Sequence, residues 1–176
     1  REATAAVARL NLNENPLTGG RRDSDFDTDI TGITALCDTL KTSSVTELAL
    51  AKCRLGPGSL GKLAEYVRDA DAALNSLNVD STGDIHSQKL YTLTASEDKI
   101  DLSSKNLGPA DINLISAWLA TDAGAASIEE VILDGNPIGY PSSVSLKPGV
   151  ATGIDVQNGV FAAINDRFGE VVVDWH

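Results

Sequence analysis

The chain has 176 residues, which is long enough for a single domain with its own hydrophobic core. Hydrophobic residues make up 42% of it and charged residues 22%, as in an ordinary soluble globular protein. A net charge of −11 argues against nucleic acid or an anionic membrane surface as a partner, because both would repel the chain. The charge favours a basic protein partner or simply good solubility. No run of 18 apolar residues occurs, so we expect no membrane insertion.

The first predicted strand lies near residue 10 and follows a spaced apolar pattern. Val7, Leu10 and Leu12 are followed by Asn15 and Leu17. A short strand buries alternate side chains, and the backbone groups of the chain that leaves the strand need hydrogen-bond partners. An inward Asn15 amide has both donors and acceptors and can supply them.

The same pattern recurs along the chain. One copy has Cys53 in the place of the Asn, another has Asn136, and two more keep the strand without the Asn. One such stretch cannot close a core by itself, so its recurrence predicts that neighbouring copies stack. In chain order, the five copies begin at Val7, Val45, Leu74, Glu97 and Ile128.

This pattern resembles the leucine-rich repeat family, whose template is L-x-x-L-x-L-x-x-[N/C]-x-L. The Leu-Gly-Pro turns at residues 55–57 and 107–109, each followed by a helical segment, are most similar to the ribonuclease-inhibitor type. The resemblance implies an α/β fold: a right-handed leucine-rich-repeat solenoid, a short horseshoe with a parallel concave sheet and convex helices. We assign residues 1–139 to this solenoid, with about five repeats.

Two stretches depart from a regular repeat. An acidic insertion at residues 21–29 lengthens the first repeat, so the second copy begins 38 residues after the first. The copy at Glu97 begins only 23 residues after the preceding one, which is too short for a full helical crossover. We therefore expect residues 85–96 to be extended. Helices are predicted over about residues 29–42 and from Pro57 and Pro109, where the missing proline N–H costs nothing.

Residues 140–176 are predicted to complete the solenoid with an irregular loop at 140–158, a helix and a terminal strand. The strand, at residues 171–175, is apolar and lacks a polar cap. A bare last strand exposes unpaired backbone groups, so we expect another chain to cover it or the protein to continue. Tyr140, Val172 and Trp175 are therefore alternative candidates for partner contacts.

The two cysteines, Cys37 and Cys53, both fall at positions predicted to face inward. We expect small buried core residues in the reduced state, because two cysteines are not the dense pattern of a disulfide-rich secreted scaffold. Methionine is absent, including at position 1, which we interpret as a processed, trimmed or partial chain. These features favour a soluble intracellular or organellar compartment.

No motif for catalysis or tight metal binding survives inspection. The alternating acids from Asp23 to Asp29 are similar to a calcium loop, but Thr28 and Thr34 stand where an EF-hand needs Gly and an acid. Weak divalent-ion binding there is one alternative, and a solvated insertion whose last Asp caps a helix is the other. Neither histidine, His86 or His176, has a second ligand at zinc spacing. We expect no cofactor, no metal and no enzymatic activity.

The candidate binding residues follow from the resemblance to a solenoid. Residues between the inward apolar ones would point outward onto the concave face, in two columns across the strands. Neighbouring strands lie about 4.8 Å apart, so acids in these columns would share one field. The candidates for this face are Asn11, Asn13, Asn78, Asp80, Asp101, Ser103 and Asp134.

Two functional hypotheses follow. The first is a non-enzymatic protein–protein interaction module that binds a basic partner through its concave face, as the resemblance to leucine-rich repeats implies. The alternative is a structural or accessory subunit of a larger protein assembly, held through the C-terminal strand and the 140–158 loop. Small polar residues on a solvated sheet can also lack any binding role, and this reading of the columns stays open.

Overall fold

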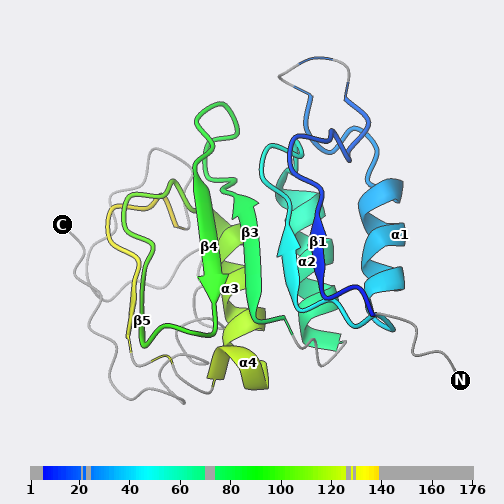
Figure 1. Cartoon of the computed structure of the whole chain (residues 1–176). Helices are drawn as coiled ribbons and strands as arrows, with labels where there is room; N and C mark the ends of the chain where they lie inside the picture. Colours follow the sequence, from blue (N-terminus) through cyan, green and yellow to red (C-terminus); the bar gives the residue numbers. More distant parts are fainter. Residues whose placement is uncertain are drawn as a thin grey trace, which may run out of the picture.

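A computed structural model describes residues 6–20, 22, 25–69, 74–125, 128 and 130–138. These residues form a mixed α/β structure in which strands line one side and helices pack behind them (Figure 1). The α/β class predicted from the sequence is therefore confirmed. The predicted loop, helix and terminal strand of residues 140–176 lie outside the described residues.

The first sheet contains four strands in the order β1-β2-β3-β4. β1 (Arg9–Asn11), β2 (Glu47–Ala49) and β3 (Ser76–Asp80) are parallel, and each occupies the same position in its repeat. Leu10 lies opposite Leu48, and Leu48 lies opposite Leu77. Leu48 and Leu77 are buried, whereas Leu10 is half-buried because β1 is at the edge of this sheet. The pairing of the first three repeats is thus the predicted one.

The fourth strand departs from the predicted parallel sheet. β4 (Leu90–Thr94) lies in the segment predicted to be extended, but it runs antiparallel to β3. It pairs with the edge of β3 that the strand of the next repeat would otherwise take, so the expectation of one continuous parallel sheet is wrong. The physical reason is the short interval, because antiparallel strands can be joined by a connection too short for a parallel crossover.

The next two repeats form a separate two-stranded sheet. β5 (Lys99–Asp101) and β6 (Glu130–Ile132) are parallel, with Ile100 opposite Val131. Figure 1 shows β5 set apart from β4 on the side away from β3. β4 and β5 are joined through residues 95–98 but do not pair with each other.

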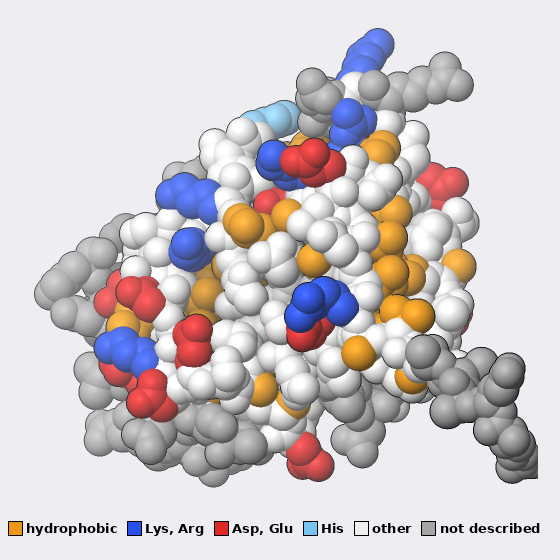
Figure 2. All heavy atoms as spheres, viewed as in Figure 1, with side chains coloured by type: hydrophobic (Ala, Val, Ile, Leu, Met, Phe, Trp, Pro, Cys, Tyr) orange, Lys and Arg blue, Asp and Glu red, His pale blue; other side chains and the backbone are white. Residues whose placement is uncertain are grey.

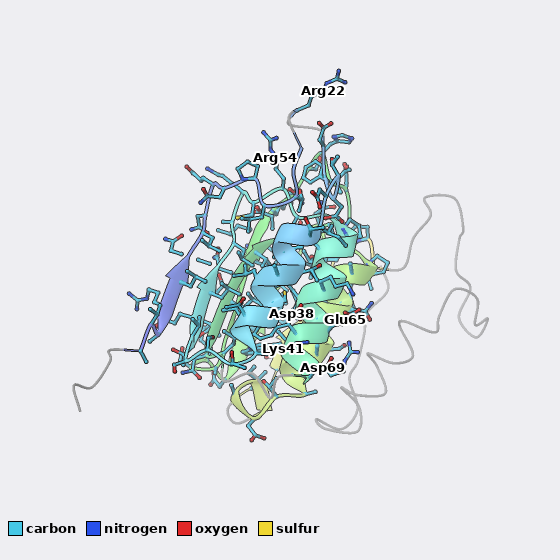
Figure 3. The ribbon with its side chains drawn as sticks, turned by 90° about the vertical axis from the view of Figure 1, so that its right-hand side faces the viewer. Arg22, Asp38, Lys41, Arg54, Glu65 and Asp69 are labelled. Atoms are coloured by element: carbon cyan, nitrogen blue, oxygen red, sulfur yellow. The ribbon has the colours of Figure 1, made fainter. Side chains whose placement is uncertain are left out.

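Helices cover one side of the strands. α1 (Thr31–Leu40), α2 (Pro57–Asp69) and α3 (Pro109–Leu119) are the three predicted helices, and the short α4 (Asp122–Ala125) follows them. α1 packs against α2, and α2 packs against α3. Figure 3 shows α1 and α2 side by side, with the strands to one side of them.

The hydrophobic core lies between the strands and the helices. Trp118 of α3 is fully buried and donates its indole N–H to the Leu74 carbonyl at 3.3 Å, which confirms its predicted core position. Cys37 and Cys53 are buried, and both thiols are free. Other large side chains that are fully buried include Ile33, Leu48, Leu50, Leu55, Leu60 and Leu63.

A buried carboxylate organises the start of α3. Asp111 is 0% exposed, and its Oδ2 accepts hydrogen bonds from the Gly108 N–H, the Thr82 N–H and the Thr82 hydroxyl, each at 2.8 Å. Its Oδ1 accepts a fourth from the Tyr91 hydroxyl at 3.0 Å. The bond to Gly108 satisfies an N–H at the helix N-terminus, as the third helical residue of a capping box does. Asp111 therefore links β4 and the segment just after β3 to α3.

Candidate functional site

The seven candidate residues of the strand face differ in their access to solvent. A side chain must be open to contact a partner, and only some of the seven are. Asn11, Asp101 and Asp134 are exposed, Asn13, Asn78 and Ser103 are half-buried, and Asp80 is buried.

Asp80 is not available to a partner, contrary to the prediction. It is 9% exposed, and its carboxylate accepts a hydrogen bond from the Lys52 N–H in the preceding repeat. Asn13 acts similarly, because its Oδ1 accepts the Ala51 N–H at 2.7 Å. The turn after β2 leaves these N–H groups without a strand partner, with Lys52 in the left-handed region at φ 56°. Asn13 and Asp80 therefore join neighbouring repeats.

Asn11 and Asn78 also form local hydrogen bonds through their side chains. The Oδ1 of Asn11 accepts the Asn13 N–H at 3.0 Å, which stabilises the turn at the end of β1. The Nδ2 of Asn78 donates to the Thr92 hydroxyl at 2.9 Å, across the β3–β4 pair. These two amides hold local structure and keep part of their polar surface for other contacts.

The polar ladder predicted at the repeat turns is present. Asn136 Nδ2 donates to the Leu102 and Leu133 carbonyls at 2.8 and 2.7 Å, and its Oδ1 accepts the Leu107 N–H at 3.0 Å. Asn15 Nδ2 donates to the Leu12 carbonyl at 2.9 Å. Cys53 holds the same place in its repeat, and its thiol lies 3.1 Å from that same Leu12 carbonyl.

The exposed acids of the strand face gather near β5 and β6. Asp101 at the end of β5 and Asp134 beyond β6 are exposed, and so is Glu97 in the turn before β5. Hydrogen bonds from Ser103 hold the pKa of Asp101 below its usual value, so this group stays ionised at neutral pH. Figure 2 shows several acidic side chains on the left of this face, over the region of β5, with basic side chains among them.

The opposite end of the strand face is closer to neutral. Arg9 on β1 pairs with Glu47 on β2, and Lys52 pairs with Glu14 at 2.9 Å. One ion pair also forms near β5, between Lys99 and Glu130 at 2.8 Å. Within the part of the chain that the structure describes, none of the three carboxylates of Glu97, Asp101 and Asp134 lies within salt-bridge distance of a basic group. The acidic field predicted for the whole face is thus concentrated at one end of it.

A groove lies between β4 and β5 beside these acids. Its volume is about 590 Å³, and both strands, the turn between them and the residues after β5 line it. Leu90 and Thr92 contribute from β4, and Asp101 and Lys105 contribute from the β5 side. The repeat pattern in the sequence does not indicate this groove. The alternation of Tyr91 and Leu93 after a shortened repeat was the signal that could have predicted an extra strand there.

Two carboxylates of the acidic insertion accept hydrogen bonds at the N-termini of helices. Asp27 accepts hydrogen bonds from the Gly56 N–H at 3.0 Å, the Gly58 N–H at 2.7 Å, and both the N–H and the hydroxyl of Ser59, at the start of α2. Asp29 accepts the Thr31 N–H at 2.9 Å at the start of α1, as predicted for the last Asp of the insertion. Asp23 lies outside the described residues. Among those that are described, no three His, Cys, Asp or Glu side chains gather as metal ligands.

The remaining predicted residues offer little chemistry. His86 is exposed, and burial raises the pKa of the Cys37 thiol to about 11. Tyr140, Val172, Trp175 and His176 lie outside the described residues. None of the helices described is both long and apolar enough to cross a membrane. No protein-family model matches the chain, and no curated protein matches it.

Proposed function

We propose that this chain is a short solenoid of the leucine-rich repeat type and acts as a non-enzymatic protein-interaction module for a basic partner. The repeated strand positions and the polar ladder of Asn15, Cys53 and Asn136 support the fold. The single observation that carries the function is the set of exposed carboxylates Glu97, Asp101 and Asp134 near β5 and β6.

These carboxylates favour a basic partner for an electrostatic reason. They lie at one end of the strand face, where acidic side chains outnumber the nearby basic ones and negative charge is in local excess. Complementary charge raises the association rate and suppresses wrong partners more than it adds raw affinity. We therefore expect binding to weaken steeply as salt is raised.

The test is a matched charge reversal. One variant carries Glu97→Lys, Asp101→Lys and Asp134→Lys, and its control carries Asp38→Lys, Glu65→Lys and Asp69→Lys on the helix side (Figure 3). Each changes the net charge from −11 to −5, since three acids become three bases. Both are compared with the unaltered chain in capture of partners from source extract, followed by titration calorimetry with the partner identified.

We expect the control to bind as the unaltered chain does and the strand-face variant to lose binding. Equal loss in both variants would reduce the effect to net charge, and retention in both would exclude this face. Circular dichroism of each variant checks that the fold is intact.

A further inference from the structure

Two strand edges in the described structure face one groove without pairing. β4 is the last strand of the first sheet, and β5 belongs to the second. The turn at residues 95–98 joins them, and the groove of about 590 Å³ lies between them. A strand edge carries a row of backbone donors and acceptors that another strand can use.

The β4 edge presents alternate residues to this groove. The Lys89 carbonyl accepts the Ser81 N–H at 2.9 Å, and the Ala95 N–H donates to the Asn75 carbonyl at 2.9 Å. Because antiparallel pairing alternates along a strand, the odd-numbered residues of β4 bond to β3. Leu90, Thr92 and Thr94 therefore direct their N–H and C=O groups away from β3, toward the groove.

The β5 edge is arranged in the same way. The Asp98 carbonyl accepts the Glu130 N–H at 3.2 Å, and the Leu102 N–H donates to the Ile132 carbonyl at 2.9 Å. Even-numbered residues thus bond to β6. Lys99 and Asp101 direct their backbone groups to the other side, toward β4.

We propose that an extended segment of a basic partner protein binds in this groove by strand addition between β4 and β5. This inference rests on the proposed interaction function and names the site and the form of the partner. A strand residue in a sheet occupies a rise of about 3.3 Å, a width of about 4.8 Å and a layer of about 10 Å. The groove volume of about 590 Å³ therefore accommodates about four residues of such a segment.

The side chains that line the groove define the chemistry of the segment. Ile100 and Leu102 present apolar surface on the inner side, while the open side carries Leu90, which is 46% exposed, and the carboxylates of Glu97 and Asp101. Successive side chains of an added strand point to opposite faces. The segment that fits alternates apolar residues, which face inward, with basic residues, which meet the carboxylates.

The test uses a defined peptide and the full chain. The probe is a fluorescein-labelled Arg-Val-Lys-Val-Arg peptide with blocked ends, and its binding is measured by fluorescence anisotropy. Two control peptides have the same side chains but carry N-methyl groups, one on the valine amides and the other on the Arg and Lys amides. Alternate amides of an inserted strand point to opposite neighbours, so each control blocks one edge.

We expect each methylated peptide to bind at least about tenfold more weakly than the probe, because each loses backbone hydrogen bonds to one strand. If one methylated peptide binds as the probe does, only one edge is used and insertion between two strands is wrong. If both do, strand addition is wrong altogether.

A pair of variants repeats the test from the side of the protein. Thr92→Pro removes an N–H that faces the groove and leaves the bonds to β3 intact, as proline at a free strand edge does. Thr92→Val changes the same side chain but keeps the N–H. We expect about a tenfold loss for Thr92→Pro and less than twofold for Thr92→Val.

The charge variants separate this proposal from the broader one. Glu97→Lys with Asp101→Lys should abolish peptide binding, and Asp38→Lys with Asp69→Lys should not. If the first pair abolishes binding while methylation and Thr92→Pro do not, the acidic face binds a basic partner but not by strand addition. If neither pair has an effect, the proposed function fails as well. If the chain alone sediments as a dimer that Thr92→Pro converts to a monomer, a second copy occupies the edge and the proposal is wrong.

Discussion

Removing the buried carboxylate of Asp111 should destabilise the protein more than removing the Asp27 carboxylate or the Asn136 amide. In Asp111→Ala the N–H groups of Gly108 and Thr82 and the hydroxyls of Thr82 and Tyr91 lose their acceptor. Each buried donor left unpaired costs about 1–3 kcal/mol, and water entering the vacated space offsets part of this, so we expect a total near 3–5 kcal/mol. That is a large part of the 5–15 kcal/mol typical of a whole domain.

The matched variant is Asp111→Asn, which should be far milder. The amide oxygen can replace Oδ2 and keep the three bonds from Gly108 and Thr82. The amide N–H₂ then donates to the Tyr91 oxygen, which accepts where it previously donated. With one bond reversed and none lost, we expect a cost of about 1 kcal/mol.

The difference in the free energy of unfolding between the unaltered chain and Asp111→Asn should depend on pH. Burial raises the pKa of Asp111 above its ordinary value of 3.8, although the four donors oppose the shift. The folded protein therefore holds this proton more tightly than the unfolded chain, and stability falls as the pH rises from 3.8 through the folded pKa. Asn does not ionise, so the stability of Asp111→Asn relative to the unaltered chain should improve over the same interval.

Urea unfolding followed by circular dichroism measures all three proteins. With a urea slope of about 2 kcal/mol per molar, a loss of about 4 kcal/mol lowers the midpoint by about 2 M. A loss below about 1 kcal/mol for Asp111→Ala would show that the carboxylate does not hold this region together. Equal losses for Ala and Asn, or a relative stability of Asn that declines with rising pH, would refute the hydrogen-bond assignment or the direction of the pKa shift.

Three further predictions concern the insertion, the ladder and the thiols. Asp27→Ala should lower the free energy of unfolding by about 2 kcal/mol, since the N–H groups of Gly56 and Gly58 at the start of α2 lose their acceptor. The neighbouring Thr28→Ala should change it by less than about 0.5 kcal/mol. Asn136→Ala should lower it by about 2 kcal/mol, and Asn136→Cys by less, because Cys53 holds the same place in another repeat; urea unfolding measures both. At pH 8 a thiol with a pKa of about 11 is about one part in a thousand thiolate, so a chromogenic disulfide reagent should react with Cys37 only after unfolding.

Each of these has an outcome that contradicts it. If Thr28→Ala is as destabilising as Asp27→Ala, the insertion acts as a whole and not through one cap. A cost for Asn136→Cys equal to that for Asn136→Ala would mean that a thiol cannot serve the ladder. Rapid labelling of Cys37 in the folded protein, with the fold verified by circular dichroism, would show that α1 opens readily.

The parts of the fold that the sequence predicts are those encoded locally. The inward residues of each repeat are set by alternation within a few positions, and Leu48, Leu77 and Ile100 are buried as the pattern requires. The Leu-Gly-Pro turns similarly predict where α2 and α3 begin, because proline is suited to the first helical position. The strand edge that β4 occupies is decided by tertiary pairing, so its direction could not be predicted.

The candidate site was harder to predict. A side chain at an outward position can be occupied as the hydrogen-bond acceptor of a backbone N–H from another repeat, and the local pattern does not show this. Asp80 is the last residue of β3, and Asp134 holds the same place in its repeat just beyond β6, yet the first is buried and the second is exposed. The difference arises from the Lys52 N–H, which belongs to a different repeat and needs an acceptor. Asp27 shows the converse, since an acid in a seemingly solvated insertion accepts hydrogen bonds at a helix about thirty residues away, at Gly58 and Ser59.

The split between the two sheets raises the question of why their open edges do not simply join two copies of this chain. A long, flat and apolar edge invites such pairing, and charged side chains at an edge oppose it. Here Glu97 and Asp101 lie at the groove, and Lys105 is the single basic residue among the described residues that line it, so a second copy would bring the same excess of acid to the same place. A basic strand would meet attraction at those positions. In the proposed function, the charges that discourage self-pairing would therefore also select the basic partner, so the charge reversal of Glu97 and Asp101 should be examined for self-association as well as for lost peptide binding.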